Sequence, residues 1–301
     1  LAEHLYECLN VICGRFYREG DRIMNPGVLV PRTELRAEVT APSRPWETGK
    51  KSRVRNIGMM FGEMMTPLLP EEILAPGPGN IKSLFVVGGN PASAIPDTHK
   101  TLEALKALEL LVVIDPHFST TARYAHYILP PKLNYEIPTI SAYEIAKFFK
   151  PYTQYSAGPA NPPAGSEVLD EHYIFWSLGK RLGLQLHLAD APLNMEAAPT
   201  VDEMLEIWTR DAQVPLSEVK KYPHGHIFDV QPQFVQAGTS DARFALFPYD
   251  VEDELADVAS EPFDDAGLKI DHGIAFTHRL TCRRMRNVIN SVTYLPNTRK
   301  R

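Results

Sequence analysis

Two uninterrupted aliphatic runs lie near the middle of the chain, at residues 84–87 (LFVV) and 110–114 (LLVVI). Neither run alternates with polar residues, which is typical of parallel strands that are buried on both faces. A third, shorter strand is predicted at residues 127–129 (YIL), where Pro130 ends it. This pattern predicts an α/β fold built on a parallel sheet.

The segment between the two runs predicts a helix. Leu102, Leu105 and Leu108 recur at near-helical spacing, and Asp97 can accept hydrogen bonds from the first N–H groups of such a helix. The connection is long enough for a crossover helix. Residues 81–130 are therefore predicted to form a right-handed βαβ unit.

Glycine and polar residues follow both strands. The sequence GGNP at residues 88–91 follows the first strand, and Asp115 with Pro116 follows the second. The carboxyl ends of neighbouring parallel strands are where open α/β sheets bind nucleotides. In that interpretation Gly89 lets a ligand approach the backbone, and the Asn90 amide supplies a donor and an acceptor.

The same residues also have a purely structural interpretation, because glycine, proline and aspartate are common in turns that end strands. As a binding group, the Asp115 carboxylate would accept hydrogen bonds from a guanine edge or a ribose hydroxyl. Ser119, Thr120 and Thr121 are expected first of all to cap a short helix at residues 119–125. Both interpretations stay open on the sequence alone.

The rest of the chain is less regular. Amphipathic patterns predict helices at residues 1–13, 63–69, 171–182 and 201–208, and an extended segment at 135–141. Residues 25–79 are rich in proline and charge and are expected to cross the surface of the α/β unit. Residues 211–265 carry little pattern. Residues 276–295 mix basic and β-forming residues, which suits the opening of a second, β-rich domain.

Composition narrows the class of protein. The 301 residues are 44% hydrophobic and 23% charged, values typical of a globular protein with about two domains. The net charge of −6 argues against a nucleic-acid-binding surface, and no apolar run reaches the roughly 20 residues of a transmembrane helix. The only cysteines are Cys8, Cys13 and Cys282, too few for a disulfide framework or a four-cysteine metal site within this chain. Cys8 and Cys13 are expected to be buried on a helix.

A basic cluster lies near the C-terminus, at Arg283, Arg284 and Arg286. Guanidinium groups bind phosphates and carboxylates, although a solvated face explains Arg284 and Arg286 equally well. Uncharged hydrogen-bonding residues follow the cluster, namely Asn287, Asn290 and Ser291. The sequence has no Ser-His-Asp signature, Walker A loop, GxGxxG or HExxH motif, so it nominates no catalytic nucleophile.

The joint order of these features resembles one family. A strand ending in Gly-Asn-Pro, a helix, a strand ending in Asp-Pro, a Thr-Ala turn, an Ile-Leu-Pro strand and a glutamate follow one another here. This order is similar to that of the molybdopterin oxidoreductases of the dimethyl sulfoxide reductase superfamily, which includes formate dehydrogenases and periplasmic nitrate reductases. Residues 281–291 (TCRRMRNVINS) resemble the start of the superfamily's C-terminal dinucleotide-binding β-barrel.

The resemblance implies three regions: a Rossmann-like α/β cofactor-binding domain at residues 1–190, a connecting region at 191–265, and the start of the β-barrel at 266–301. It also implies molybdenum or tungsten held by two molybdopterin guanine dinucleotides. The residues that it places at this cofactor are Gly89, Asn90, Ile114, Asp115, Glu136, Glu171, Thr281, Arg283, Arg284, Asn287, Asn290 and Ser291.

Within that set, Asn90, Ile114 and Asp115 would contact one guanosine portion, and the block at 281–291 would approach pterin and phosphate groups. Two positions depart from the family pattern, His126 and Ile137, where the family usually has aspartate and glycine. In the family, the metal ligand and the cysteines of the 4Fe-4S cluster lie upstream. We therefore expect this chain to be an internal piece of a longer protein, inactive by itself.

The leading functional hypothesis is a catalytic subunit of a molybdenum or tungsten oxidoreductase. A formate dehydrogenase-like role is favoured, with a small-molecule substrate and electron-transfer subunits as partners. One alternative is a non-catalytic structural or electron-relay subunit, as in respiratory complex I. Another is a plain nucleotide-binding α/β module. The residues do not specify the compartment: the cytoplasm is slightly favoured, and a twin-arginine signal upstream would indicate the periplasm.

Overall fold

The structure is a computed structural model that describes residues 1–141, 148–260, 270–271 and 274–275. The chain divides into two compact units. The smaller unit combines Leu1–Arg15 with Ala245–Arg301, and the larger one is Phe16–Phe244. In the described part of the chain, every helix is too short or too polar to cross a lipid bilayer.

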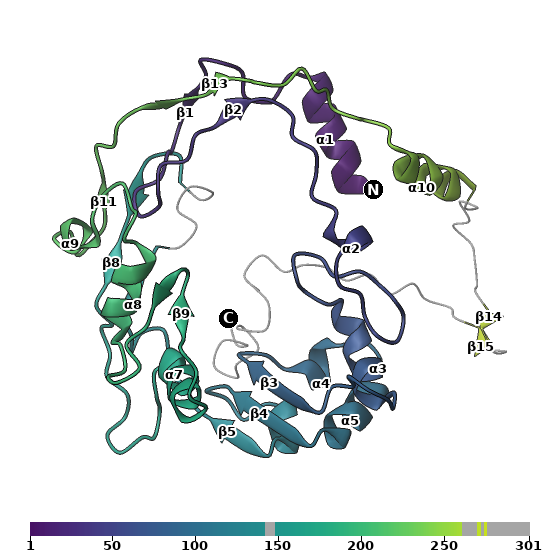
Figure 1. The fold of residues 1–301 in the computed structure, drawn as a ribbon, viewed down its shortest axis with the longest axis vertical. Helices are drawn as coiled ribbons and strands as arrows, with labels where there is room; N and C mark the ends of the chain where they lie inside the picture. The colour runs from purple at the N-terminus through teal and green to yellow at the C-terminus, as the bar shows by residue number, and fades with distance from the viewer. Residues whose placement is uncertain (142–147, 261–269, 272–273, 276–301) are drawn as a thin grey trace. The chain divides into compact units, whose positions relative to one another are not determined.

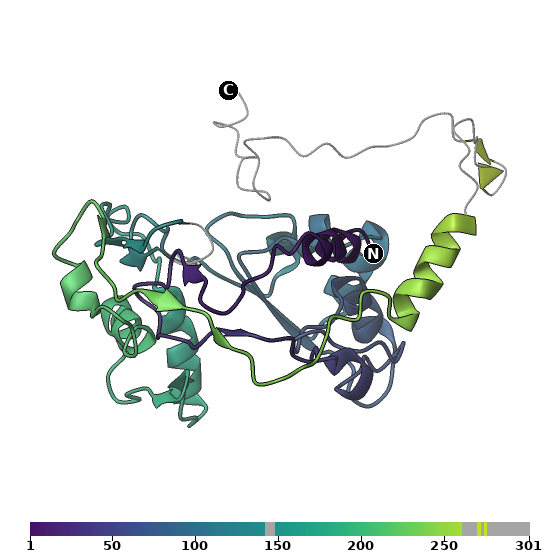
Figure 2. The same cartoon turned by 90° about the horizontal axis from the view of Figure 1, so that it is seen from above.

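The smaller unit contains helices α1 (Ala2–Ile12) and α10 (Tyr249–Ser260). It also contains the antiparallel pair β14 (Ile270–Asp271) and β15 (Ile274–Ala275), the two short yellow arrows of Figure 2. The helix predicted at residues 1–13 is confirmed, but it buries no residue.

The prediction that both N-terminal cysteines are buried is therefore wrong. Cys13 is exposed and Cys8 is half-buried. The Sγ–H of Cys8 points to the carbonyl oxygen of Leu246 at 3.5 Å. Because α1 lies at the surface, its apolar stripe did not indicate a core position.

The larger unit is organised around a parallel sheet in the order β3-β4-β5 (Figure 1). Its strands are β3 (Ser83–Val87), β4 (Leu110–Ile114) and β5 (Tyr127–Leu129). All three predicted strands are confirmed. Ile114 pairs with Val87 on one side and with Leu129 on the other, so the carboxyl ends of the three strands are in line.

Helix α5 (Thr98–Ala107) connects β3 to β4, as the leucine spacing predicted. Asp97 is its N-cap, and a carboxylate oxygen of Asp97 accepts a hydrogen bond from the Lys100 N–H at 3.1 Å. Asp97 itself has a φ of 56°, in the left-handed region that aspartate tolerates better than most residues.

Side chains alternate between the two faces of β4. Leu111 and Val113 pack with Leu105 of α5 in one cluster, and α3 (Leu69–Leu74) adds Ile73 to it. Val112 and Ile114 pack on the opposite face with residues of α7 (Glu171–Arg181), chiefly Ile174. The central strand is thus covered by helices on both faces (Figure 1).

The prediction that residues 84–87 are buried on both faces is wrong. Phe85 is 41% exposed and Val87 is 43% exposed, and Val86 is the one buried residue of β3. The reason is that β3 is an outer strand of the sheet, and the cluster that α7 forms includes side chains of β4 and β5 only. An uninterrupted apolar run therefore did not distinguish an edge strand from a central one.

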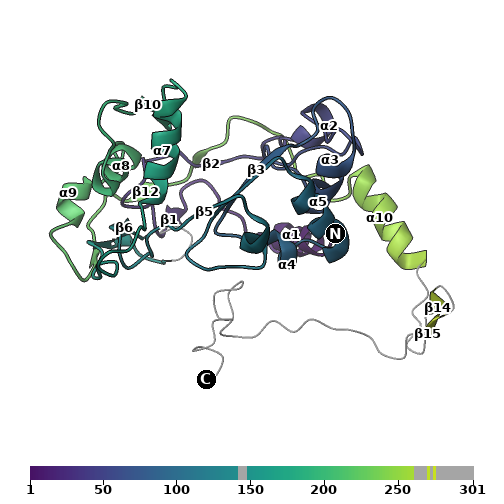
Figure 3. The same cartoon turned by 90° about the horizontal axis from the view of Figure 1, so that it is seen from below.

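The remaining elements of the larger unit are short. The strand pairs are β1 (Arg22–Ile23) with β12 (Gln233–Phe234), β2 (Arg36–Ala37) with β13 (Gln236–Ala237), β6 (Thr139–Ile140) with β8 (Tyr155–Ser156), β7 (Tyr152–Thr153) with β11 (His226–Ile227), and β9 (His187–Leu188) with β10 (Ala191–Pro192). The helices are α2 (Pro45–Thr48), η1 (Thr66–Leu68), α4 (Pro91–Ala94), η2 (Thr121–Tyr124), α8 (Val201–Trp208) and α9 (Leu216–Val219). Figures 1 and 3 both show α8 beside α7.

The structure corrects two expectations about residues 25–79. The proline-rich excursion at residues 25–79 does not only cross the α/β unit, because Val28 and Leu29 form a second core with Val219 and Phe228. The helix predicted at 63–69 begins later, with η1 and α3.

A charged cluster anchors residues 52–56 to the helices beside the sheet. Glu71 of α3 accepts two hydrogen bonds from the Arg55 guanidinium and one from Lys100 Nζ of α5 at 2.8 Å. Next to it, the backbone N–H of Val54 donates to the Glu72 carboxylate at 2.9 Å. The Arg55 guanidinium, and then the Lys100 ammonium, lower the pKa of Glu71 from 4.5 to about 2.

This cluster predicts a specific acid sensitivity. A carboxyl group whose pKa is depressed in the folded state stabilises that state above its unfolded pKa, and the contribution is lost as the pH falls from about 4.5 toward about 2. Glu71→Gln should therefore flatten the decline of the free energy of unfolding in that range. Urea unfolding at several pH values measures this dependence of the free energy of unfolding on pH. Glu103→Gln is the control, because Glu103 is an exposed residue of α5. Equal pH profiles for Glu71→Gln and the unmutated protein would contradict this role.

Candidate functional site

The candidate site lies where β3 and β4 end. The N–H of Gly88 donates to the carbonyl oxygen of Ile114 at 2.9 Å, so the loop after β3 starts beside the last residue of β4. Gly88 has a φ of 58°, which glycine adopts at little cost. The structure thus brings the GGNP turn and Asp115 to the same edge of the sheet, as the sequence predicted.

Asn90 is tied to a loop that is 31 positions away. Its Oδ1 accepts hydrogen bonds from the Thr121 Oγ1–H at 2.7 Å and from the Thr121 N–H at 3.1 Å. Its Nδ2 donates to Ser93 Oγ at 3.1 Å. Thr121 Oγ1 also accepts from the N–H of Ala92 at 3.0 Å. The side chain of Asn90 therefore joins the turn after β3 to η2.

The role of Thr121 in the structure differs from the predicted one. The sequence predicts that Thr121 caps a short helix, but the N-cap of η2 is Thr120, and the side chain that bonds the first turn is Ser119, whose Oγ accepts from the Ala122 N–H at 3.2 Å. Thr121 is instead fully buried against the GGNP turn. The Thr-Ala turn of the family pattern was the signal that could have indicated it.

Asp115 has one oxygen engaged and one available. Its Oδ1 accepts from the His117 N–H at 2.8 Å, which closes an Asx turn. Among the residues that the structure describes, Oδ2 has no hydrogen-bond partner. The half-buried carboxylate can therefore accept hydrogen bonds from a ligand at the end of β4.

The two glycines of the turn have different roles. A Cβ built on Gly88 would meet no atom within 4 Å, so open space adjoins the backbone there. A Cβ on Gly89 would lie 3.6 Å from a methyl carbon of Val86, an ordinary contact. Gly88 is required for its dihedral angles, and the space beside it is where a ligand can approach the main chain.

Three other predicted residues belong to β4, to the segment after β5 and to α7. Ile114 is fully buried, and its carbonyl oxygen accepts the hydrogen bond from the Gly88 N–H. It therefore holds the GGNP turn beside the end of β4. Glu136 follows β5, and its Oε2 accepts from the Leu133 N–H at 2.8 Å. Glu171 is exposed in the first turn of α7, where a carboxylate interacts favourably with the helix dipole.

The segment after β5 is joined to the start of α7. Lys132 Nζ forms an ion pair with the Asp170 carboxylate at 3.0 Å, and Pro131 bridges Leu169 in the parallel direction. The structure thereby links the loops that carry Glu136 and Glu171. The other predicted residues, Thr281, Arg283, Arg284, Asn287, Asn290 and Ser291, lie outside the described residues.

The donor and acceptor groups at this edge fit a guanosine. Guanine presents neighbouring N–H donors to which a carboxylate such as that of Asp115 is complementary, and its carbonyl oxygen accepts from an amide N–H such as that of Asn90. A ribose diol would also suit the carboxylate. No three histidine, cysteine, aspartate or glutamate side chains converge as a metal site in the ranges that the structure describes.

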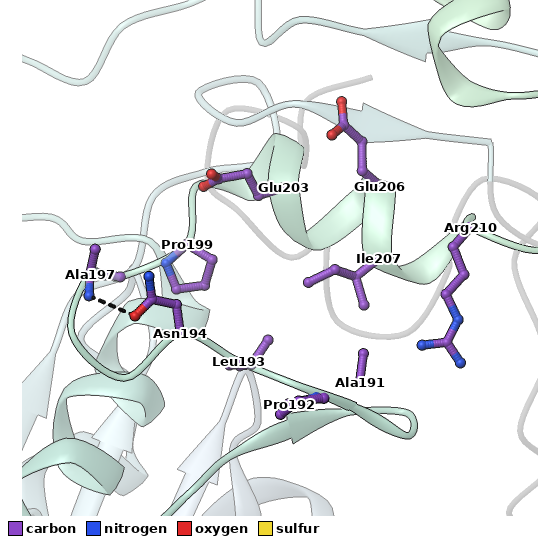
Figure 4. Close-up of a pocket in the computed structure, with 11 residues that line it drawn as sticks. Ala191, Pro192, Leu193, Asn194, Ala197, Pro199, Glu203, Glu206, Ile207 and Arg210 are labelled. Atoms are coloured by element: carbon purple, nitrogen blue, oxygen red, sulfur yellow. Dashed lines mark hydrogen bonds between the residues drawn. The ribbon is translucent and has the colours of Figure 1, made fainter.

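A separate cavity of about 530 Å³ lies between α8 and the β9–β10 hairpin (Figure 4). The sequence did not indicate it. Its lining is mainly apolar, and its charged side chains already have partners: Arg210 binds Asp190 and Asp211, Glu203 caps α8 through Thr200, and Glu206 binds Lys220. The charged side chains of the lining are thus hydrogen-bonded or ion-paired within the protein, and the cavity lacks the convergent polar groups of a binding site.

Comparison with known proteins places the site in a family context. Residues 42–138 match the molybdopterin oxidoreductase family. The chain is 29% identical over 113 residues to the probable oxidoreductase YyaE of Bacillus subtilis, an alignment that covers 38% of this chain and 16% of that protein.

Two further relatives match shorter stretches. The alpha subunit of F420-dependent formate dehydrogenase 1 of Methanococcus maripaludis is 39% identical over 59 residues, 20% of this chain and 9% of that protein. The assimilatory nitrate reductase catalytic subunit of Bacillus subtilis is 44% identical over 52 residues, 17% of this chain and 7% of that protein. The matched stretches span less than a fifth of the length of each relative.

Proposed function

We propose that the chain is part of the catalytic subunit of a molybdenum or tungsten enzyme, because residues 42–138 match the molybdopterin oxidoreductase family. Its role there is to bind the guanosine portion of one molybdopterin guanine dinucleotide at the carboxyl ends of β3 and β4. The enzyme carries out two-electron oxidation or reduction of a small molecule. A formate dehydrogenase-like substrate is favoured by the match to a formate dehydrogenase alpha subunit.

One observation carries this proposal. The GGNP turn and Asp115 adjoin each other through the Gly88–Ile114 hydrogen bond, and open space adjoins the backbone of Gly88. The Oδ2 atom of Asp115 has no hydrogen-bond partner among the described residues. Such an edge is where α/β sheets bind nucleotides. The redox chemistry belongs to the metal and its pterins, which transfer electrons to or from the substrate when they are bound. The residues of this chain bind and orient the nucleotide end.

The proposal extends to the regions beyond this edge. Residues 1–190 form the Rossmann-like α/β cofactor-binding domain, residues 191–265 connect it, and residues 266–301 open the dinucleotide-binding β-barrel. In the last region, the block at 281–291 donates hydrogen bonds from its arginine and asparagine side chains to pterin and phosphate groups. Electron-transfer subunits complete the enzyme.

A second candidate is a non-catalytic relative that keeps the fold as a structural or electron-relay subunit. The observation that favours it is the internal bonding of the two key side chains. Asn90 bonds Thr121 of η2, and Asp115 closes its own turn through the His117 N–H. In such a protein both residues would be retained for the fold alone.

Cofactor analysis of the intact protein separates the two candidates. The protein is purified from cells supplied with molybdate or tungstate, its metal is measured by elemental analysis, and nucleotides are released by denaturation. We expect about two guanine nucleotides for each metal atom, as a pair of pterin dinucleotides supplies. A protein that contains neither metal nor guanine nucleotide under both growth conditions would contradict the catalytic assignment and favour the second candidate.

A further inference from the structure

The Asn90–Thr121 contact carries an inference about which end of the Asn90 amide faces the ligand. A carboxamide oxygen has two lone pairs, and its nitrogen has two N–H bonds. Thr121 supplies two donors to Oδ1, its hydroxyl at 2.7 Å and its backbone N–H at 3.1 Å. The acceptor capacity of Asn90 is thus used within the protein.

The donor end of Asn90 is only partly used. One Nδ2–H donates to Ser93 Oγ at 3.1 Å. Within the described ranges of the chain, the second Nδ2–H has no partner. Asn90 is half-buried at the end of β3, so this N–H is available to a ligand beside the GGNP turn.

The Thr121 side chain is held firmly in its own position. It is 0% exposed, and its hydroxyl donates to Asn90 while accepting from the N–H of the buried Ala92 at 3.0 Å. A buried hydroxyl that both donates and accepts has one fixed orientation. Rotation of the Asn90 amide by 180° would set its Nδ2–H groups against the Thr121 N–H.

We propose that Thr121 is a positioning residue that holds Asn90 as a hydrogen-bond donor toward the bound nucleotide. The ligand group that meets Asn90 must then be an acceptor, such as a carbonyl oxygen or a ring nitrogen of the base. This inference rests on the proposed function, because it concerns the same nucleotide edge. It assigns to Thr121 a role that its place at the start of a helical turn did not suggest.

The test uses the intact protein from molybdate-supplied cells and measures guanine nucleotide retained per protein after purification. Thr121→Val keeps the shape of the side chain and removes the hydroxyl, whereas Thr121→Ser keeps the hydroxyl. We expect Thr121→Val to lower the amount of guanine nucleotide retained about tenfold, which corresponds to the loss of one hydrogen bond at the upper end of the usual range for neutral groups. Thr121→Ser should restore retention to within about twofold, which a loss of general packing would not do.

Asn90→Asp tests the donor directly and covers the case in which Thr121→Val fails to fold. It keeps an acceptor for both Thr121 bonds and replaces only the NH₂ group. We expect retention to fall about tenfold or more while the unfolding temperature changes little. Normal retention in Asn90→Asp, or in folded Thr121→Val, would overturn the positioning role.

Asp115→Asn, made in parallel, distinguishes failure of this inference from failure of the proposed function. If Asp115→Asn loses the nucleotide and the Thr121 and Asn90 variants retain it, the site stands and the positioning role is rejected. If Asp115→Asn also retains it, the nucleotide is bound elsewhere, and the proposed site and the inference both fall. Loss in Asp115→Asn, Asn90→Asp and Thr121→Val, with retention in Thr121→Ser, supports both.

Discussion

Leu111→Ala is expected to lower the free energy of unfolding of the larger unit by about 2–5 kcal/mol, the range found for leucine truncations in protein cores. Leu111 is 0% exposed and lies in β4, the central strand, where it packs in the cluster that joins the sheet to α3 and α5. Its truncation removes apolar contacts and leaves a cavity that two helices and two neighbouring strands must close. Urea unfolding followed by circular dichroism measures the effect.

Leu133→Ala is the matched control, because Leu133 follows β5 and is 47% exposed. Its truncation should change the free energy of unfolding by less than about 0.5 kcal/mol. A second comparison, Leu111→Ile, keeps the side-chain volume and should cost less than about 1.5 kcal/mol. If Leu111→Ala proves as mild as Leu133→Ala, β4 is not the centre of the core.

The features that the sequence predicted correctly depend on local signals. The strands of the sheet follow from apolar runs, and the α5 N-cap follows from a single aspartate before a leucine-rich helix. A parallel pair needs a crossover connection, so adjacent runs with a helix between them leave little choice of topology. The meeting of the GGNP turn with Asp115 follows from the same register.

The features that the sequence did not predict depend on distant partners. The pairing of β1 with β12 joins two-residue strands that are about 210 positions apart, too short to show a period of two. The exposure of Phe85 depends on where α7 packs, which the composition of β3 does not encode. The bond between Asn90 and Thr121 likewise joins two loops, each of which has an adequate local explanation as a turn or a cap.

Asp115→Asn is expected to reduce the guanine nucleotide retained by the intact protein about 10- to 100-fold, the effect of losing one hydrogen bond to a charged acceptor. The substitution keeps Oδ1, so the bond from the His117 N–H at 2.8 Å and the turn that it closes can remain. It replaces the available Oδ2 with an NH₂ group, which would face the N–H donors of a guanine or the hydroxyls of a ribose. The measurement is nucleotide released per protein, together with the metal content.

Asp97→Asn is the control for Asp115→Asn, because it makes the same chemical change at a residue with a purely local role. The Asp97 side chain accepts one hydrogen bond, from the Lys100 N–H, and asparagine caps helices about as well as aspartate. Asp97→Asn should therefore retain the nucleotide and unfold close to the unmutated protein. Equal nucleotide loss in both variants would trace the effect to the fold of the βαβ unit, whereas loss in Asp115→Asn alone would assign the free carboxylate oxygen to the ligand.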